Sequence, residues 1–282
     1  MIQFRRRRRH ALVATDLDRT MIYSRNAFDT ATDVPTVCVE QLDGSPLSFM
    51  TTAAALRMQA LTVSAAVVPA TTRTIKQFDR IQLPGAPWRY AITSNGGNIL
   101  VDGVPDRRWR GGIDALVRAG GATLTEVTAA LADRIDDSWV DKFRVADQLF
   151  CYLAVKPRAV PEGFLAEWDS WCRARGWSAS QQGRKIYTMP DAVCKSRAVA
   201  EVRRRLRENG ELDNDARTFA AGDGALDAAM LRTADAAIRP RHGELEQLNW
   251  THPNLTVTRA TGILAGAEIV DWFIAASPEL TD

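Results

Sequence analysis

Two carboxylates that could do chemistry lie one residue apart near the start of the chain, in the string LVATDLDRT. Asp16 and Asp18 directly follow an apolar run, residues 11–15, of the kind that forms a buried parallel strand. Open α/β sheets bind ligands at the carboxyl ends of such strands. Carboxylates this close repel each other unless a cation or a shared proton relieves them, so the pair indicates a metal site or acid/base chemistry. For the pair alone, a surface turn is the alternative.

Two later strand ends carry side chains of a similar kind. The second predicted strand, residues 65–69, is followed by the hydroxyl groups of Thr71 and Thr72. A short strand predicted near the end of the chain leads into the loop GDGALD, which contains Asp223 and Asp227. Because the carboxyl ends of parallel strands meet at one edge of a sheet, we expect these side chains to lie close to the first pair. For Thr71 alone, a helix N-cap is the alternative.

So many carboxylates need a cation beside them, and Lys195 could supply it. This lysine begins a predicted helix, in a chain whose positive charge comes almost wholly from arginine. A compact ammonium group suits a point contact to a phosphate oxygen. A solvated helix start is the alternative for Lys195 on its own.

The elements that must position these residues alternate between strand and helix at both ends of the chain. A hairpin is predicted around the turn Asp43-Gly44, and we expect it to stand near the acidic loop and shape access to it. Another strand stops at the turn SNGG. The predicted strands are 36–40, 47–50, 65–69, 90–93, 218–221 and 236–238, and the helices are 51–61, 75–81, 198–206, 228–232 and 263–276.

A segment with a different pattern of predicted helices and strands separates these two parts. It predicts helices at 112–118, 124–135 and 161–175 and strands such as 149–155 and 185–189, with polar or glycine-containing turns between them. This pattern is typical of a compact α+β insert. We therefore predict an α/β fold: a doubly wound, Rossmann-like parallel sheet formed by residues 1–98 and 190–282, with an α+β domain inserted at 99–189. Trp168 and Trp171, at helical spacing, are expected in the core of the insert.

Composition is close to the globular average. The chain has 282 residues, 46% hydrophobic and 25% charged, with a net charge of +2, so global charge does not favour nucleic acid. The basic run Arg5 to Arg9 could touch nucleic acid or acidic lipid but is more often a solvated terminus, and the apolar segment after it is too short for an export signal. No stretch reaches the roughly 20 apolar residues that span a bilayer. The cysteines lack CxxC spacing, so we expect neither a zinc site nor disulfides. We therefore expect the protein in a reducing cytoplasm.

The order of the motifs resembles that of the haloacid dehalogenase (HAD) superfamily of phosphatases. The likeness is to its type with a C2 cap, type IIB, which includes Cof-like and sucrose-phosphate-phosphatase-like proteins, and it spans nearly the whole chain. Arg19 and Thr72 depart from the common pattern, since many relatives have glycine there. The matching motifs are DxDxT at 16–20, the strand-terminal threonine with its arginine at 71–73, Lys195, GDxxxD at 222–227 and the turn TSNGG at 93–97.

The resemblance implies a Mg²⁺-dependent phosphomonoester hydrolase that works through an aspartyl-phosphate. Asp16 would be the nucleophile, and Asp18 would protonate the leaving oxygen and then activate water. An anionic phosphate resists attack by a carboxylate, so such a site needs a divalent metal and fixed positive groups. Mg²⁺, a hard ion that binds carboxylate and phosphate oxygens, fits best.

The resemblance also implies which residues bind metal, phosphate and substrate. Thr71, through its hydroxyl and amide, would bind the phosphate together with Thr72 and Lys195. The metal ligands would be Asp16, Asp223, Asp227 and the backbone carbonyl of Asp18.

The insert would be a mobile cap, which in this family closes over the site, excludes water and selects the substrate. Arg73 and Asn95 from the core and Arg184 and Lys185 from the cap are the candidate substrate-binding residues. For the last two, a solvated basic pair at a strand start is the alternative.

Substrate and reaction type stay open at this point. A sugar phosphate comes first, because relatives with this cap include sucrose-phosphate and mannosylglycerate-phosphate phosphatases. A nucleotide phosphatase, or a phosphotransferase or phosphomutase that uses the same aspartyl-phosphate, are the alternatives. A non-catalytic binding protein would be expected to have lost a nucleophile or metal ligand, and none is lost. We expect a small phosphorylated metabolite as partner, no membrane or nucleic-acid association, and a monomer or homodimer.

Overall fold

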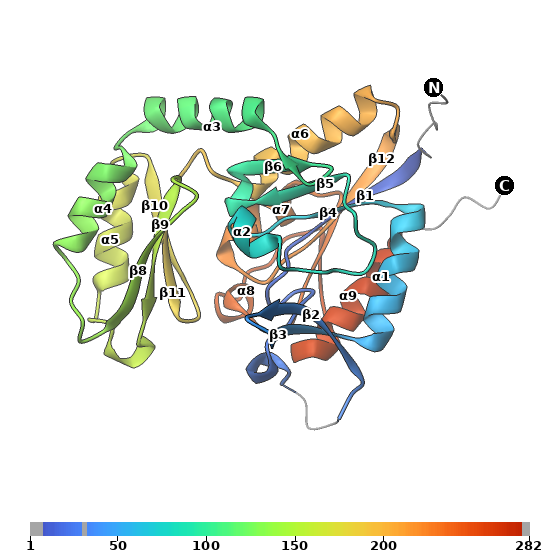
Figure 1. Ribbon diagram of the computed structural model, residues 1–282, viewed down its shortest axis with the longest axis horizontal. Helices are drawn as coiled ribbons and strands as arrows, with labels where there is room; N and C mark the ends of the chain where they lie inside the picture. Colours follow the sequence, from blue (N-terminus) through green and yellow to red (C-terminus); the bar gives the residue numbers. More distant parts are fainter. Residues whose placement is uncertain (1–7, 30–32, 278–282) are drawn as a thin grey trace.

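The computed structural model describes residues 8–29 and 33–277, so Arg5 to Arg7 of the basic run lie outside the described residues. The larger of two units, on the right in Figure 1, is built on a five-stranded parallel sheet. The α/β class predicted from the sequence is confirmed. The strand order is β14-β13-β12-β1-β4, formed by Leu255–Val257, Ala236–Arg239, Leu212–Ala221, Arg9–Thr15 and Ala66–Pro69.

The strands of this sheet are apolar along most of their length because both faces are covered. In β1, Leu12, Val13 and Ala14 are fully buried. Val13 packs in one core cluster with α1 (Thr52–Ser64) and α9 (Gly262–Ala276). Leu12 and Ala14 point to the other face and pack with α6 (Lys195–Glu208) and α7 (Ala228–Thr233). The sheet is therefore doubly wound, as predicted.

The predicted hairpin is present as β2 (Thr36–Leu42) and β3 (Ser45–Thr51). Asp43 and Gly44 at its tip both have positive φ, 50° and 76°, as a two-residue hairpin turn requires. Tyr23 and Phe49 exchange backbone hydrogen bonds of 2.9 Å, which tie β3 to the loop that follows β1. The hairpin therefore lies beside the acidic loop.

A smaller antiparallel sheet joins the α/β unit to the insert. It consists of β5 (Tyr90–Thr93), β6 (Asn98–Val101) and β7 (Val104–Pro105), and Ile99 of β6 packs in the core of the larger unit. The helix predicted from residue 75 is shorter than expected, α2 (Ile75–Phe78). The domain boundary at residue 99 stays a prediction.

The second unit contains a four-stranded antiparallel sheet with helices on it, on the left in Figure 1. Trp139, Trp168 and Trp177 are fully buried in its own apolar core. The sheet order is β10-β11-β9-β8, formed by Trp177–Gln182, Lys185–Pro190, Phe150–Val155 and Val140–Ala146. The helices are α3 (Arg107–Gly120), α4 (Leu124–Ala132) and α5 (Phe164–Arg173).

The helix α6 of the core is attached to the start of α3, where the chain enters the insert. Asp106 caps the N-terminus of α3 by accepting hydrogen bonds from the amides of Arg108 and Trp109. The other oxygen of Asp106 pairs with Arg205, near the end of α6. Short helices complete the structure: α8 (Glu244–Gln247) and the 3₁₀ turns η1 (Arg25–Ala27), η2 (Ser94–Gly96), η3 (Pro157–Ala159) and η4 (Ala225–Asp227). Among the described residues, every helix is too short or too polar to cross a membrane.

Candidate active site

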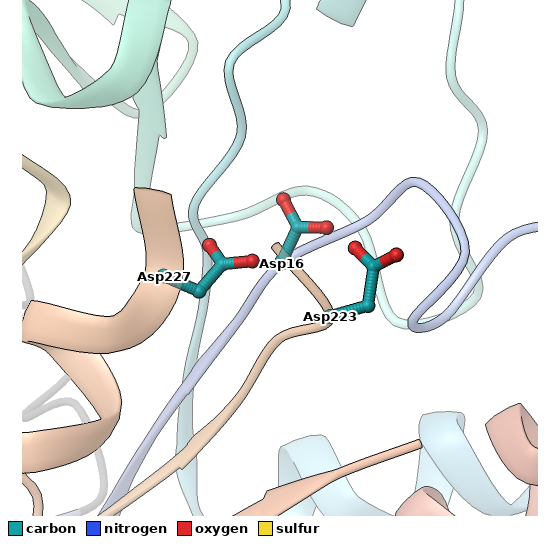
Figure 2. A group of neighbouring side chains, drawn as sticks. All are labelled: Asp16, Asp223 and Asp227. Carbon is teal, nitrogen blue, oxygen red and sulfur yellow. The ribbon is translucent and has the colours of Figure 1, made fainter. Parts of the chain in front are cut away.

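The parallel sheet brings the predicted strand ends together at one edge. Thr15, the last residue of β1, is aligned with Ala221 of β12 and with Pro69 of β4. Asp16 and Asp223 therefore follow neighbouring strands, and η4 returns Asp227 to the same place, as Figure 2 shows. The N-terminus of α6 adds Lys195, whose Nζ lies 2.6 Å from Asp16 Oδ1 and 2.6 Å from Asp227 Oδ1.

The three aspartates form a cluster that fits a hard cation. One oxygen from each of Asp16, Asp223 and Asp227 lies within 4.8 Å of the others, and all three residues are buried. Asp223 Oδ2 has no hydrogen-bond partner, and the nearest cation, Arg19 Nε, lies 3.5 Å away. A buried carboxylate oxygen without a partner is costly in a protein. The donor set, all oxygen, is the kind that Mg²⁺ binds.

The electrostatics of the cluster indicate a deficit of positive charge. Burial, together with the charges of Asp227 and Asp18, raises the pKa of Asp16 to about 7 despite the opposing effect of Lys195. Burial and the nearby Asp16 also raise the pKa of Asp223 well above its ordinary value. A divalent cation would favour the ionised form of both groups.

Asp18 does not belong to the cluster and is held differently. Its side chain is 46% exposed, and Arg73 binds it through two hydrogen bonds, Nε to Oδ2 at 2.7 Å and Nη2 to Oδ1 at 2.8 Å. Packing raises the pKa of Asp18, but the charge and hydrogen bonds of Arg73 outweigh this and leave it below the ordinary value. Arg73, a candidate substrate-binding residue from the sequence, is thus engaged by a core carboxylate.

A second carboxylate on Arg73 was not anticipated from the sequence. Glu40, in β2 of the hairpin, is only 2% exposed and accepts a hydrogen bond from Arg73 Nη1 at 2.6 Å. Arg80 Nη2 reaches the same oxygen at 3.0 Å, and Ser48 Oγ donates to the other oxygen at 2.6 Å. The only sequence signal was a glutamate inside the apolar stretch TVCVE of a hairpin placed beside the acidic loop.

The predicted phosphate-binding threonines follow β4. Thr71 is fully buried, and its amide donates to the carbonyl of Ile92 at 2.9 Å. Thr71 Oγ1 accepts a hydrogen bond of 3.1 Å from the amide of Arg73, so its hydroxyl proton is left for another acceptor. Thr72, the next residue, is half-buried. Of the two Thr71 groups expected to contact phosphate, the amide is therefore already engaged.

Asn95 links the threonine loop to the start of α6. Its amide donates to the carbonyl of Thr71 at 2.9 Å, and its Nδ2 donates to the carbonyl of Val193 at 3.1 Å. Its Oδ1 is buried without a partner. Next to it, Gly96 has a φ of 98°, and a Cβ there would lie 2.4 Å from the carbonyl oxygen of Cys194. The turn TSNGG thus packs directly against the backbone that carries Lys195.

The hairpin β10–β11 of the insert reaches into this site. Gln182 Nε2, at the end of β10, donates to Asp223 Oδ1 at 3.2 Å. The Nζ of Lys185 lies over the rings of Tyr152 and Tyr187, 5.4 and 5.8 Å from their centroids. Desolvation lowers the pKa of Lys185, but the charges of Tyr187 and Asp18 raise it above the ordinary value.

The other basic candidate of the insert, Arg184, is placed differently. It lies in the two-residue turn between β10 and β11, its side chain is 70% exposed, and its Nη2 pairs with Asp141 of β8 at 2.8 Å. The structure therefore brings Lys185 to the site and turns Arg184 toward the sheet of the insert.

Solved structures with a similar fold were found, whereas neither a family model nor a curated protein matches the chain. A sucrose-phosphatase from Synechocystis, solved with sucrose and phosphate, is 15% identical with a TM-score of 0.64, over 94% of this chain and 98% of that one. A sugar phosphatase of HAD subclass IIB is 12% identical with a TM-score of 0.57, over 93% and 98% of the two chains.

A third similar structure comes from Bacteroides thetaiotaomicron. It is described as a phosphatase of the HAD superfamily and is 12% identical with a TM-score of 0.54, over 94% of this chain and 95% of that one. In all three cases the similarity extends through both units, the α/β sheet and the inserted antiparallel sheet. This chain therefore has the fold of the HAD superfamily hydrolases with a C2 cap, type IIB.

Proposed function

We propose that this protein is a Mg²⁺-dependent phosphomonoester hydrolase that acts through an aspartyl-phosphate. One observation carries the proposal: Asp16, at the carboxyl end of β1, is held by the buried ammonium of Lys195 within a cluster of three carboxylates. The fold, shared with several phosphatases, supports the same reaction class.

Asp16 is the proposed nucleophile. Lys195 holds Oδ1 at 2.6 Å, and Thr20 Oγ1 lies 3.4 Å from Oδ2, so the carboxylate is oriented from both sides. A fixed carboxylate can attack phosphorus without the entropy loss of orienting itself first. The positive charge of Lys195 also lies where negative charge builds up on the transferred group.

The metal ligands would be Asp16, Asp223, Asp227 and the backbone carbonyl of Asp18. Mg²⁺ bound there would neutralise charge on the phosphoryl oxygens. The hydroxyl of Thr71, together with Thr72 and Lys195, would bind the remaining oxygens. Asp18, which does not belong to the carboxylate cluster, is the proposed acid that protonates the leaving oxygen and the base that activates water.

A small phosphorylated metabolite, first a sugar phosphate, is the proposed substrate. The insert offers two tyrosine rings and the ammonium of Lys185, whose charge acts on Asp18, which suits a polar, hydroxylated leaving group. A structurally similar protein from Plasmodium falciparum is described as an IMP-nucleotidase, so nucleotides belong in the same screen. A phosphotransferase would be recognised by transfer of phosphate to an added acceptor sugar.

The cysteines favour a reducing compartment, and we propose the cytoplasm. Within the described residues, all four cysteines of the chain are free thiols: Cys38, Cys151, Cys172 and Cys194.

The experiment that tests the proposed function is a Mg²⁺-dependent screen of phosphorylated metabolites with Asp16→Asn as control. We expect phosphate release that needs Mg²⁺ and falls to background in the variant, because the amide cannot form an aspartyl-phosphate. Asp18→Asn should slow turnover by about a hundredfold or more and accumulate phospho-enzyme. Hydrolysis that survived Asp16→Asn would rule out the covalent route.

A further inference from the structure

We propose that Glu40 is a positioning residue of this site: through Arg73, it aims the carboxyl group of Asp18 at the leaving oxygen. The inference rests on the proposed function, in which Asp18 transfers the proton. It gives the hairpin β2–β3 a role in catalysis, because Glu40 lies in that hairpin. The reacting groups themselves lie at the ends of other strands.

Arg73 lies between two carboxylates and uses different parts of its guanidinium for each. Nε and Nη2 form a fork on Asp18, and Nη1 binds Glu40 at 2.6 Å. A guanidinium group is planar, so fixing Nη1 also fixes the direction of the fork. Asp18 is half-exposed and, among the described residues, Arg73 is the group that hydrogen-bonds its carboxylate. The orientation of Asp18 is thus set by where Glu40 holds Arg73.

The carboxylate of Glu40 is itself fixed by its surroundings. It is buried, and both of its oxygens are used: Oε1 by Arg73 and Arg80, and Oε2 by Ser48 at 2.6 Å. A buried carboxylate persists only when such partners compensate for its lost hydration. Glu40 is also bridged through its backbone to Ile81, so the hairpin strand itself is fixed against the segment that follows α2.

Two other cations act on Asp18 but do not share this arrangement. Lys185, at the start of β11 in the insert, and Lys195, at the start of α6, lower the pKa of Asp18 through their charge alone. An ammonium group is a point charge and imposes no plane on its partner. The direction of the Asp18 carboxylate therefore depends on Arg73, and so on Glu40.

The step that Glu40 would affect can be written in full. Asp16 bonds to phosphorus while the bond from phosphorus to the leaving oxygen breaks, and a proton that Asp18 has taken up from solvent, or from water in the previous turnover, moves to that oxygen. A water oxygen then bonds to phosphorus, its proton moves to Asp18, and the bond to Asp16 breaks. A benzyl alkoxide must be protonated by Asp18 in order to leave, whereas p-nitrophenolate leaves readily without a proton.

The test compares benzyl phosphate and p-nitrophenyl phosphate, two probes of similar size. The measured quantity is the leaving-group ratio, kcat/KM for benzyl phosphate divided by kcat/KM for p-nitrophenyl phosphate. We expect Asp18→Asn to lower this ratio by about a hundredfold or more. Glu40→Gln, which keeps the size of the side chain but removes its charge, should lower the ratio by about tenfold, with thermal unfolding measured alongside.

Glu201→Gln is the matched control. Glu201 is also bound by two arginines, Arg204 and Arg205, but it lies on α6 away from Asp18. This control should leave the ratio unchanged. An equal loss of kcat/KM with both probes in Glu40→Gln would mean a structural role only, and an unchanged ratio would mean no role; either result overturns the inference.

A double-mutant cycle tests the route through Arg73 and covers the case in which Glu40→Gln folds poorly. Arg73→Lys keeps the charge but cannot bind both carboxylates, so it should lower the leaving-group ratio by itself. Adding Glu40→Gln to it should change the ratio no further, and independent, additive effects would contradict the relay. If the wild-type protein forms no phospho-enzyme with any phosphorylated compound, the proposed function fails. If the enzyme is active but its leaving-group ratio does not change in Glu40→Gln, only the inference about Glu40 fails.

Discussion

At the scale of single residues, the site is a set of buried carboxylates with few positive charges beside them. Asp16 and Asp227 share the ammonium of Lys195, and burial raises the pKa of Asp16 to about 7. A carboxyl group whose pKa is higher in the folded chain binds its proton more tightly there. Its contribution to stability is therefore full below about pH 4 and is lost as the pH rises through about 7.

This predicts a pH dependence for the metal-free protein. In the presence of a chelator, raising the pH from about 4 to about 7 should remove up to about 4 kcal/mol of unfolding free energy through Asp16. Asp16→Asn lacks this loss. Urea unfolding at several pH values measures the difference in unfolding free energy between the two proteins. Carboxyl groups with a lowered pKa, such as Asp18 and Glu40, are present in both proteins, so their contributions cancel in this difference. Parallel pH profiles would contradict the prediction.

The residues found from sequence and those missed differ in one respect. The five residues Asp16, Asp18, Asp223, Asp227 and Lys195 were found because each lies at a strand end or helix start that local pattern reveals. Glu40 and Gln182 act through partners that are distant in the chain, Arg73 at 33 positions and Asp223 at 41. The burial of a glutamate beside two arginines arises only when the hairpin packs on the loop after β4, and no periodicity encodes that.

At the scale of elements, continuous apolar runs predicted the buried parallel strands, and the turn Asp43-Gly44 between two strand-like runs predicted the hairpin. The strands β8 and β10 of the insert were missed. β8 reads VDKFRVA, in which charged residues interrupt the apolar ones, and β10 reads WSASQQ, which is mostly polar, so neither has the continuous apolar run of a buried strand. Helix ends were also misjudged: α3 begins at Arg107 instead of residue 112, because Asp106 caps it and three arginines surround the single apolar residue of the first turn, Trp109.

The close contact between the turn TSNGG and α6 leads to a prediction at this scale. Gly96→Ala should lower stability by about 2 kcal/mol or more, because the new Cβ meets the Cys194 carbonyl at a backbone angle that disfavours side chains. It should also lower activity by displacing Lys195. Gly103→Ala is the control, since Gly103 has a φ of 80° but nothing within 4 Å of its Cβ position.

Urea unfolding and phosphate release measure these two effects. The glycine control carries the strain of positive φ alone, about 1 kcal/mol, and should keep full activity. Equal destabilisation by the two alanines would mean that the contact with Cys194 carries no weight.

At the scale of the whole molecule, the insert and the core form one site. In the hairpin β10–β11, Gln182 donates to Asp223 and the charge of Lys185 acts on Asp18, while in the turn β8–β9 Asp147 accepts from the amide of Ile75, at the start of α2, at 3.1 Å. The sequence indicated an α+β insert, but which of its residues would face the core depends on how the two units dock.

This docking predicts different roles for two adjacent basic residues. Lys185→Gln should raise KM for an anionic substrate by about tenfold, because the ammonium faces the site, and should affect kcat less. Arg184→Gln should leave both constants unchanged, since its side chain pairs with Asp141. Steady-state kinetics on the substrate found in the screen would separate the two, and equal effects would argue against the observed placement of Lys185.

The helix α6 has a mechanical consequence for this arrangement. It carries Lys195 at its first residue and Arg205, the partner of the α3 cap Asp106, ten residues later. At 1.5 Å per residue, about 15 Å of stiff helix separates these two points. The helix thus keeps the ammonium of Lys195 and the cap of α3 at a fixed separation, so a movement of the insert that displaced Asp106 together with Arg205 would have to shift α6, and with it Lys195, as a whole.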